Sequence, residues 1–191
     1  MLLNERAVVM AVQRGDAAAF RSLVERYEKP IYGFLYRLVG DPELARDLAQ
    51  DAFLAAYCAL PGLKGDVAFS PWLYKIALNC ARQALRRRRL IAWLPWTAQH
   101  DVSSAPLDLS IEAQVVHQAL ACLPADLRIP LVLRLVEGFS YGELAAIIGI
   151  SEAAVRMRVL RARRMFRTIY TAVEAESMGD IIESLASGGE Q

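Results

Sequence analysis

Apolar residues recur every three or four positions along almost the whole of this 191-residue chain. That spacing matches the helical turn of 3.6 residues, so each such segment has one apolar face to bury. Phe20, Leu23, Val24, Tyr27 and Ile31 form the first clear stripe. No hairpin dipeptide lies between alternating apolar and polar runs. The sequence therefore predicts an all-α fold.

Residues that start and stop helices divide this pattern. Asp16 is a predicted N-cap, Pro30 is expected to kink or split the helix that follows, and Gly40 is suited to end it. The pairs Asp41–Pro42 and Ser70–Pro71 each place a capping residue before a proline at the first helical position. We therefore expect new helices to begin at both pairs.

Residues 96–110 lose the helical period and are rich in Ser, Pro and Asp. Such a segment is typical of a linker, so we predict two small helical domains, at 1–95 and 111–170. An acidic tail, 171–191, follows and is expected to hold at most one short helix. In the second domain the pattern predicts helices near 111–121, 124–136, 141–148 and 152–169.

Charge is distributed unevenly, although the formal net charge is only +1. Residues 61–100 hold seven Lys and Arg and one acid, and residues 151–170 hold six Arg and one acid. The remainder of the chain is acidic. Two local positive patches on an acidic protein favour a polyanionic partner such as nucleic acid.

Several other classes of protein are disfavoured. The chain has two histidines, no metal-ligand spacing, no Gly-rich phosphate loop and no nucleophile motif, so we predict no enzyme, no cofactor and no metal site. The N-terminal apolar run contains charges and resembles neither a signal peptide nor a membrane span. Three separated cysteines in apolar helical patterns are expected to be buried and reduced. We expect a cytoplasmic protein without membrane insertion.

Residues 140–166 carry the most specific motif, "SYGELAAIIGISEAAVRMRVLRARRMF". Ser140 and Glu143 form a predicted capping box, Gly149 suits a left-handed turn, and Val155 is placed to fill the angle between two helices. This is the pattern of a helix-turn-helix, whose second helix enters the major groove of DNA. Arg side chains suit guanine edges and apolar groups suit thymine methyls. The predicted duplex contacts are Ser151, Ala153, Arg156, Met157, Leu160, Arg161, Arg163 and Arg164.

The upstream patch contains the run Arg86–Arg89, which alone is also typical of a solvated helix end. Trp72, Tyr74, Asn79 and Arg82 lie on the same predicted helix. Aromatic and amide groups beside arginines suit the unstacked bases of single-stranded DNA. A protein that binds duplex with one patch and single strand with the other is suited to a promoter as it opens.

Three ordered segments, "DPELARDLAQDAFLAAY", "FSPWLYKIALNCARQALRRRR" and "LPADLRIPLVLRLVEGFSYGELAAIIGISEAAVRMRVLRARRMF", carry a resemblance to a known family. Over residues 10–170 the chain resembles the extracytoplasmic-function, or group IV, sigma factors of bacterial RNA polymerase. The resemblance implies a transcription initiation factor with two helical domains, sigma domain 2 and sigma domain 4.

For the first domain, the resemblance implies binding to core polymerase and recognition and melting of the −10 element. The helix over 42–60 is similar to the family's core-binding helix, so Asp47, Gln50 and Asp51 are candidate polymerase contacts. Ordinary solvated positions are the alternative for these three. A base of the −10 element that is flipped out of the stack would contact two places: the helix that reads this element and the loop before that helix. The candidate −10 contacts are Ala59, Leu63, Lys64, Trp72, Tyr74, Asn79, Arg82 and Arg86. For Tyr74 the alternative is a half-buried core position.

For the second domain, the resemblance implies that the helix near 152–167 reads the −35 element. Ala153 and Ala154 stand where the family often has Gly-Thr, and Met157 replaces a frequent small polar residue. These departures bear on promoter sequence more than on fold. The implied partners are promoter DNA, core RNA polymerase through its β′ coiled coil and β flap, and an anti-sigma factor that holds the free protein inactive.

Two other interpretations are less well supported. A helix-turn-helix regulator that binds duplex DNA without polymerase is the alternative, and the group from Trp72 to Arg86 argues against it. An anti-sigma or adaptor protein would not need two basic DNA-binding faces. The acidic tail is interpreted as a solubilising segment, with shielding of the arginine helix or binding of a regulator as alternatives. Trp93 and Trp96 are expected to dock the linker or to meet a partner.

Overall fold

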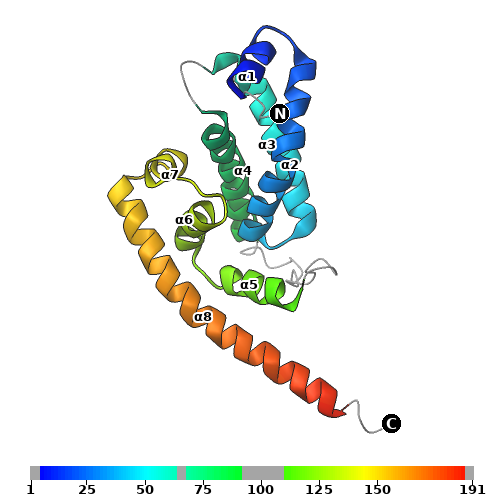
Figure 1. Ribbon diagram of the computed structural model, residues 1–191, viewed down its shortest axis with the longest axis vertical. Helices are drawn as coiled ribbons and strands as arrows, with labels where there is room; N and C mark the ends of the chain where they lie inside the picture. Colours follow the sequence, from blue (N-terminus) through cyan, green and yellow to red (C-terminus); the bar gives the residue numbers. More distant parts are fainter. Residues whose placement is uncertain (1–4, 64–67, 92–109, 188–191) are drawn as a thin grey trace.

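The computed structural model describes residues 5–63, 68–91 and 110–187, and every regular element within those ranges is helical (Figure 1). The first domain contains α1 (Glu5–Gln13), α2 (Ala17–Val39), α3 (Pro42–Ala59), a short 3-10 turn (Leu60–Gly62) and α4 (Phe69–Ile91). The second contains α5 (Ile111–Ala121), α6 (Ala125–Leu135), α7 (Tyr141–Ile148) and α8 (Glu152–Ser187). The predicted all-α class is confirmed. Lys64, Trp93, Trp96 and the predicted linker up to residue 109 lie outside the described residues.

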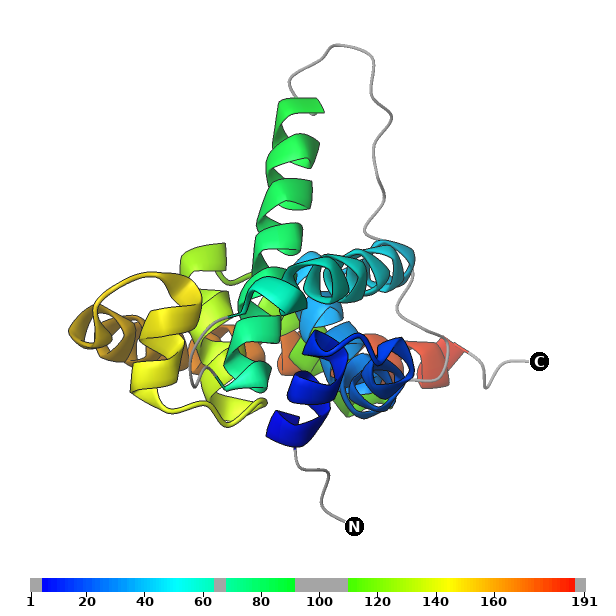
Figure 2. The ribbon, with the colours of Figure 1, turned by 90° about the horizontal axis from the view of Figure 1, so that it is seen from above.

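The core of the first domain forms where α2, α3 and α4 pack together. The apolar stripe of α2 faces inward, and Leu23, Ile31 and Phe34 are completely buried. Small residues of α3, among them Ala45 and Ala52, are also completely buried and let the helices approach closely. The C-terminal part of α4 projects beyond the other helices (Figure 2).

Local signals fix where most of these helices begin and end. Asp16 and Asp41 accept hydrogen bonds from the backbone of the following first turns, at 3.1 and 3.0 Å. Each bond satisfies an amide that the helix itself leaves without an acceptor. Gly40 ends α2 with φ at 75°, a left-handed conformation that is unfavourable for residues with a side chain. The predicted caps at these positions are confirmed.

The helix-turn-helix forms as predicted. Ser140 accepts from the backbone of Glu143, and the Glu143 carboxylate accepts from the backbone of Ser140, so both halves of the capping box are present. Gly149 ends α7 in the left-handed region with φ at 82°. Val155 is completely buried between α7 and α8. The turn chemistry therefore sets the angle at which α8 leaves the domain.

Three expectations about helix boundaries are corrected. Helix α2 is not split at Pro30, which sits on its exposed side and removes one backbone donor, while the buried stripe packs on both sides of it. Helix α4 begins at Phe69, so Ser70 lies inside it and does not cap it. Helix α8 continues to Ser187 in place of a separate short helix, because residues 168–178 contain neither Gly nor Pro.

The cysteines also differ from expectation. Cys58 and Cys122 are exposed, and only Cys80 is partly buried. Cys58 lies on the outer side of α3, and Cys122 is the residue that ends α5, where the chain turns toward α6. An apolar helical context therefore did not bury either residue.

No helix in the described part of the chain is both long enough and apolar enough to span a membrane.

The two domains pack against each other. Helices α5, α6 and α7 of the second domain lie along α2 and α4 of the first (Figure 1). The contact includes Phe139, whose ring meets that of Tyr74 edge-on at 4.9 Å, and Arg128, whose Nη1 donates to the carbonyl of Leu38 at 2.9 Å. We call this contact the seam.

Candidate nucleic-acid interface

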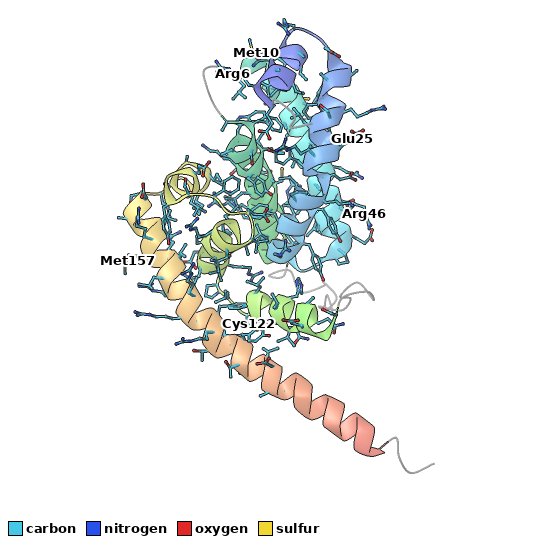
Figure 3. The ribbon with its side chains drawn as sticks, in the orientation of Figure 1. Arg6, Met10, Glu25, Arg46, Cys122 and Met157 are labelled. Atoms are coloured by element: carbon cyan, nitrogen blue, oxygen red, sulfur yellow. The ribbon has the colours of Figure 1, made fainter. Side chains whose placement is uncertain are left out.

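The residues predicted to read duplex DNA lie on the outward side of α8. All eight of them, from Ser151 to Arg164, are exposed. Met157 exposes 59% of its surface and Leu160 46%, although both are large and apolar (Figure 3). On the opposite side of the helix Val155, Val159 and Ala162 are buried. The helix therefore offers a free, positively charged face with apolar groups inside it.

Arg156 is held in place by its neighbours. Its guanidinium pairs with the carboxylate of Glu152, one turn earlier, and lies over the ring of Tyr141 with its central carbon 4.5 Å from the ring centroid. Arg134 approaches the same ring at 5.0 Å. A guanidinium stacked on an aromatic ring gains a favourable interaction with the ring face. Sequence analysis missed Tyr141 and Arg134, because the stacking joins residues of three helices.

The residues predicted to read single-stranded DNA lie along α4 and at its approach. Ala59, Asn79 and Arg86 are exposed, whereas Leu63, Trp72 and Arg82 are partly buried. Trp72 packs against Phe69 with ring centroids 5.7 Å apart. Lys64 lies outside the described residues. Six of the eight candidates thus have some exposed surface on or beside one helix.

Tyr74 is the exception, because it is buried with only 3% of its surface exposed. Its ring packs between Phe34 of the first domain and Phe139 of the second, and its hydroxyl donates to the carboxylate of Glu137. Burial, then the hydrogen bond to Glu137, raises the pKa of the Tyr74 hydroxyl well above its ordinary value. Burial likewise raises the pKa of the Glu137 carboxyl, with Tyr74 and Arg37 opposing. Tyr74 is unavailable to DNA while the seam is closed.

Other polar contacts at the seam cover the same side of the first domain. The Nη2 group of Arg82 donates to the carbonyl of Ile148 at 3.3 Å. The ring of His117 stacks on that of Tyr36, with centroids 4.4 Å apart. Burial, followed by the charges of Arg128 and Arg37, lowers the pKa of His117. These contacts join α4 to the end of α7 and α2 to α5.

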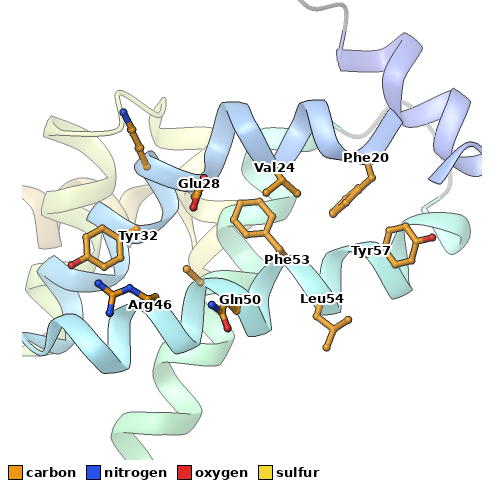
Figure 4. A pocket seen from close by; sticks show the side chains of 11 residues that line it. Phe20, Val24, Glu28, Tyr32, Arg46, Gln50, Phe53, Leu54 and Tyr57 are labelled. Atoms are coloured by element: carbon orange, nitrogen blue, oxygen red, sulfur yellow. The ribbon is translucent and has the colours of Figure 1, made fainter. Parts of the chain in front are cut away.

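The predicted polymerase contacts lie elsewhere, on α3. Asp47, Gln50 and Asp51 are all exposed. Gln50 lines a groove of about 740 Å³ between α2 and α3 (Figure 4). Phe53 and Leu54 also line it, and Leu54 exposes 64% of its surface. An apolar groove with polar groups at its edge is the kind of surface that receives a partner's helix.

Two family models match the chain. Sigma-70 region 2 matches residues 23–91, and Sigma-70 region 4 matches residues 113–166. The first match covers most of α2 together with α3 and α4, and the second covers α5 to the middle of α8.

Curated relatives match over most of their length. The RNA polymerase sigma-H factor of Pseudomonas aeruginosa is 41% identical over 175 residues, covering 84% of this chain and 90% of the relative. The ECF RNA polymerase sigma-E factor of Escherichia coli is 36% identical over 180 residues, covering 84% of this chain and 91% of the relative.

Two solved structures share the fold over most of the chain. CnrH in complex with the cytosolic domain of CnrY matches with a TM-score of 0.70 and 28% identity, covering 87% of this chain and 97% of that one. The sigma factor RpoE of Bartonella quintana, in complex with the anti-sigma factor NepR, matches with a TM-score of 0.65 and 26% identity, covering 80% and 96%.

Proposed function

The chain belongs to the sigma-70 family of RNA polymerase sigma factors, in its extracytoplasmic-function group, and we propose that it directs core polymerase to promoters with the two faces described above. One observation carries this assignment beyond the family. A single chain presents an arginine-rich helix-turn-helix face on α8 and a separate aromatic and basic face on α4. An ordinary duplex-binding regulator needs only the first.

On α8, we assign the −35 element to the eight exposed residues listed above. In a helix-turn-helix, the second helix lies in the major groove of DNA. Arg156 and Arg161 supply forked donors for guanine edges, while Met157 and Leu160 supply apolar contacts for thymine methyls. Arg163 and Arg164 supply positive charge for the adjacent phosphates. Met157 in place of a small polar residue favours a −35 base that carries a methyl group.

On α4, we assign the −10 element to the candidate face from Trp72 to Arg86. Asn79 has an amide for base edges, and Arg82 and Arg86 supply charge for the strand's phosphates. Tyr74 and part of Arg82 are covered at the seam, so −10 reading requires the second domain to move away from α4. Reading of the −35 element needs no such movement.

Core polymerase binding is assigned to α3. Gln50 lines the groove in which Phe53 and Leu54 are placed to receive apolar side chains of the polymerase, and Asp47 and Asp51 are exposed on the same helix. The protein performs no bond chemistry in this role, and its place of action is the cytoplasm, where bacterial polymerase works. Of the two solved structures that share its fold, one is a complex with the anti-sigma factor NepR and the other a complex with the cytosolic domain of CnrY, which supports control by an anti-sigma factor.

Run-off transcription tests the assignment. Purified bacterial core polymerase is supplied with a pooled promoter library, with and without this protein. We expect protein-dependent starts whose upstream sequences share two spaced elements. A protein that shifts duplex DNA alone, but neither binds core polymerase nor directs starts, would instead be a polymerase-independent regulator.

A further inference from the structure

A second feature of the seam is a cavity of about 340 Å³ where the later part of α4, the start of α6 and the turn from α7 into α8 meet. Three arginines line it: Arg82 and Arg86 from α4 and Arg158 from α8. Arg158 stands outside the duplex-reading face, since it is partly buried while its neighbours Met157 and Arg156 are exposed. It belongs to the cavity rather than to the −35 surface.

The charge in this cavity is poorly balanced. Asp126 is the one acidic residue among those lining it. Within residues 5–63, 68–91 and 110–187, no carboxylate forms an ion pair with any of the three arginines. Arg82 makes one hydrogen bond, to the neutral carbonyl of Ile148. The closed seam thus brings guanidinium groups of two domains together without enough negative charge to compensate them.

Like charges in a partly buried site raise its free energy. Burial, and then the charge of Arg158, lowers the pKa of the Arg82 guanidinium, which is the expected sign of that repulsion. A multivalent anion between the two domains would remove the repulsion and add charge-assisted hydrogen bonds. Guanidinium forks match the paired oxygens of carboxylate and phosphate, and of these the polyphosphate carries more negative charge in a compact group, which suits three arginines.

We propose that this cavity binds a compact polyphosphate, either inorganic pyrophosphate or the phosphate chain of a nucleotide, and that the bound anion ties the second domain to α4. The apolar wall formed by Leu85, Ile129 and Pro130 gives the site a closed side away from solvent. Because Arg82 and Arg86 are also assigned to the −10 strand, the anion and promoter DNA compete for the same two side chains. The binding itself rests on the closed seam alone, and only the competition rests on the proposed function.

Calorimetric titration of the full-length protein with pyrophosphate, at constant ionic strength, tests the site. We expect saturable binding with one anion per chain. Arg158→Gln should weaken it by about tenfold, which corresponds to about 1.4 kcal/mol, because charge-assisted hydrogen bonds to the anion are lost. Arg82→Gln, on the opposite wall, should give a loss of similar size. Arg21→Gln removes the same charge from an exposed position of α2 and should leave the affinity unchanged.

Further experiments distinguish the two sources of phosphate and control for misfolding of the variants. Arg158→Lys keeps the positive charge but removes the forked donors of the guanidinium. This variant should fold normally, and it should nevertheless bind pyrophosphate more weakly than the parent chain. Titration with ATP shows whether the site accepts a nucleotide's phosphate chain or only the inorganic anion, and either result agrees with the proposal. Equal loss in Arg21→Gln, or equal affinity for sulfate, would overturn it by showing general attraction of anions. Binding that fails to saturate would do the same.

Discussion

The outward face of α8 and the seam-facing side of α4 are both rich in arginine and both assigned to promoter DNA, yet one is open and the other is partly covered. On α8 all eight predicted contacts are exposed. On α4 Tyr74 is buried against Phe139, and Arg82 donates a hydrogen bond to the last residue of α7, Ile148. We propose from this comparison that the free protein is ready to read duplex DNA, whereas reading of the single strand depends on separating its domains.

The largest expected effect comes from removing the open face. Arg156→Ala combined with Arg161→Ala should weaken binding to a selected −35 duplex by about a hundredfold or more, because each forked contact to a base contributes about 1 to 3 kcal/mol. Fluorescence anisotropy with a labelled duplex measures it. Binding of the −10 single strand should not change.

Arg21→Ala is the matched control for that loss, since it removes an exposed arginine of the first domain. If it weakened duplex binding as much as the double variant, α8 would be acting only through overall charge.

The next effect concerns the covered face. Glu137→Ala removes the acceptor of the Tyr74 hydroxyl, so that closing the seam would bury an unsatisfied donor. We expect the free protein to bind a −10 single strand about tenfold more tightly, because such a buried group costs about 1 to 3 kcal/mol. Glu25→Ala, at an exposed position of α2, should leave this affinity as it was. No gain in Glu137→Ala would mean that the seam does not restrict the −10 face.

A smaller effect is expected from changing Gly149, in the turn that sets the direction of α8. Gly149→Ala places a side chain at φ +82°, with no atom within 4 Å of the new Cβ, so the cost is backbone strain alone. We expect a loss of about 1 kcal/mol in the free energy of unfolding of the second domain. Chemical denaturation, followed by exchange of amides in α7 and α8, measures it. A loss shared equally by amides of α2 and α3 would show that the domains unfold as one unit.

The smallest effect is a pH dependence of the seam. His117 has its pKa lowered from the ordinary value of 6.5 in the closed arrangement, where Arg128 and Arg37 face it. The neutral imidazole therefore contributes its full stabilisation of the closed arrangement above pH 6.5. This stabilisation is lost as the pH falls through the lowered pKa of the closed arrangement. We expect the domains to separate more readily at about pH 5.5 than at about pH 8.

His117→Phe keeps a ring on Tyr36 and should remove this dependence. The raised pKa of Glu137 acts in the opposite direction, because a carboxyl that binds its proton more tightly in the closed arrangement favours closure as the pH falls. A dependence that survives in His117→Phe would assign it to another group.

Helix-turn-helix geometry was predictable because its determinants are local. Ser140 and Glu143 cap one turn, and Gly149 supplies one left-handed residue, so each signal lies within four positions of its effect. The same holds for Asp41 before Pro42. The possible split at Pro30 does not occur, because the packing of the buried stripe on either side of it outweighs the loss of one backbone bond.

The covered state of α4 was not predictable in the same way. Tyr74 and Glu137 are 63 positions apart, and Arg82 and Ile148 are 66 apart. No local pattern records which of two amphipathic surfaces will meet across a linker. The sequence left Tyr74 as either a DNA contact or a core position, and the packing of Phe34 and Phe139 against it gives the core position in the closed arrangement.

The distance between the two domains tests the central claim most directly. Cys58 on α3 and Cys122 at the end of α5 are exposed and lie in different domains, whereas burial raises the pKa of the Cys80 thiol and lowers its reactivity. Donor and acceptor dyes on the first two, in a Cys80→Ser chain, report the separation by energy transfer. We predict high transfer in the free protein and a clear fall when core polymerase and promoter DNA are added. Transfer that stays unchanged while the same sample initiates transcription would contradict the account, because the −10 face would then be read without opening the seam.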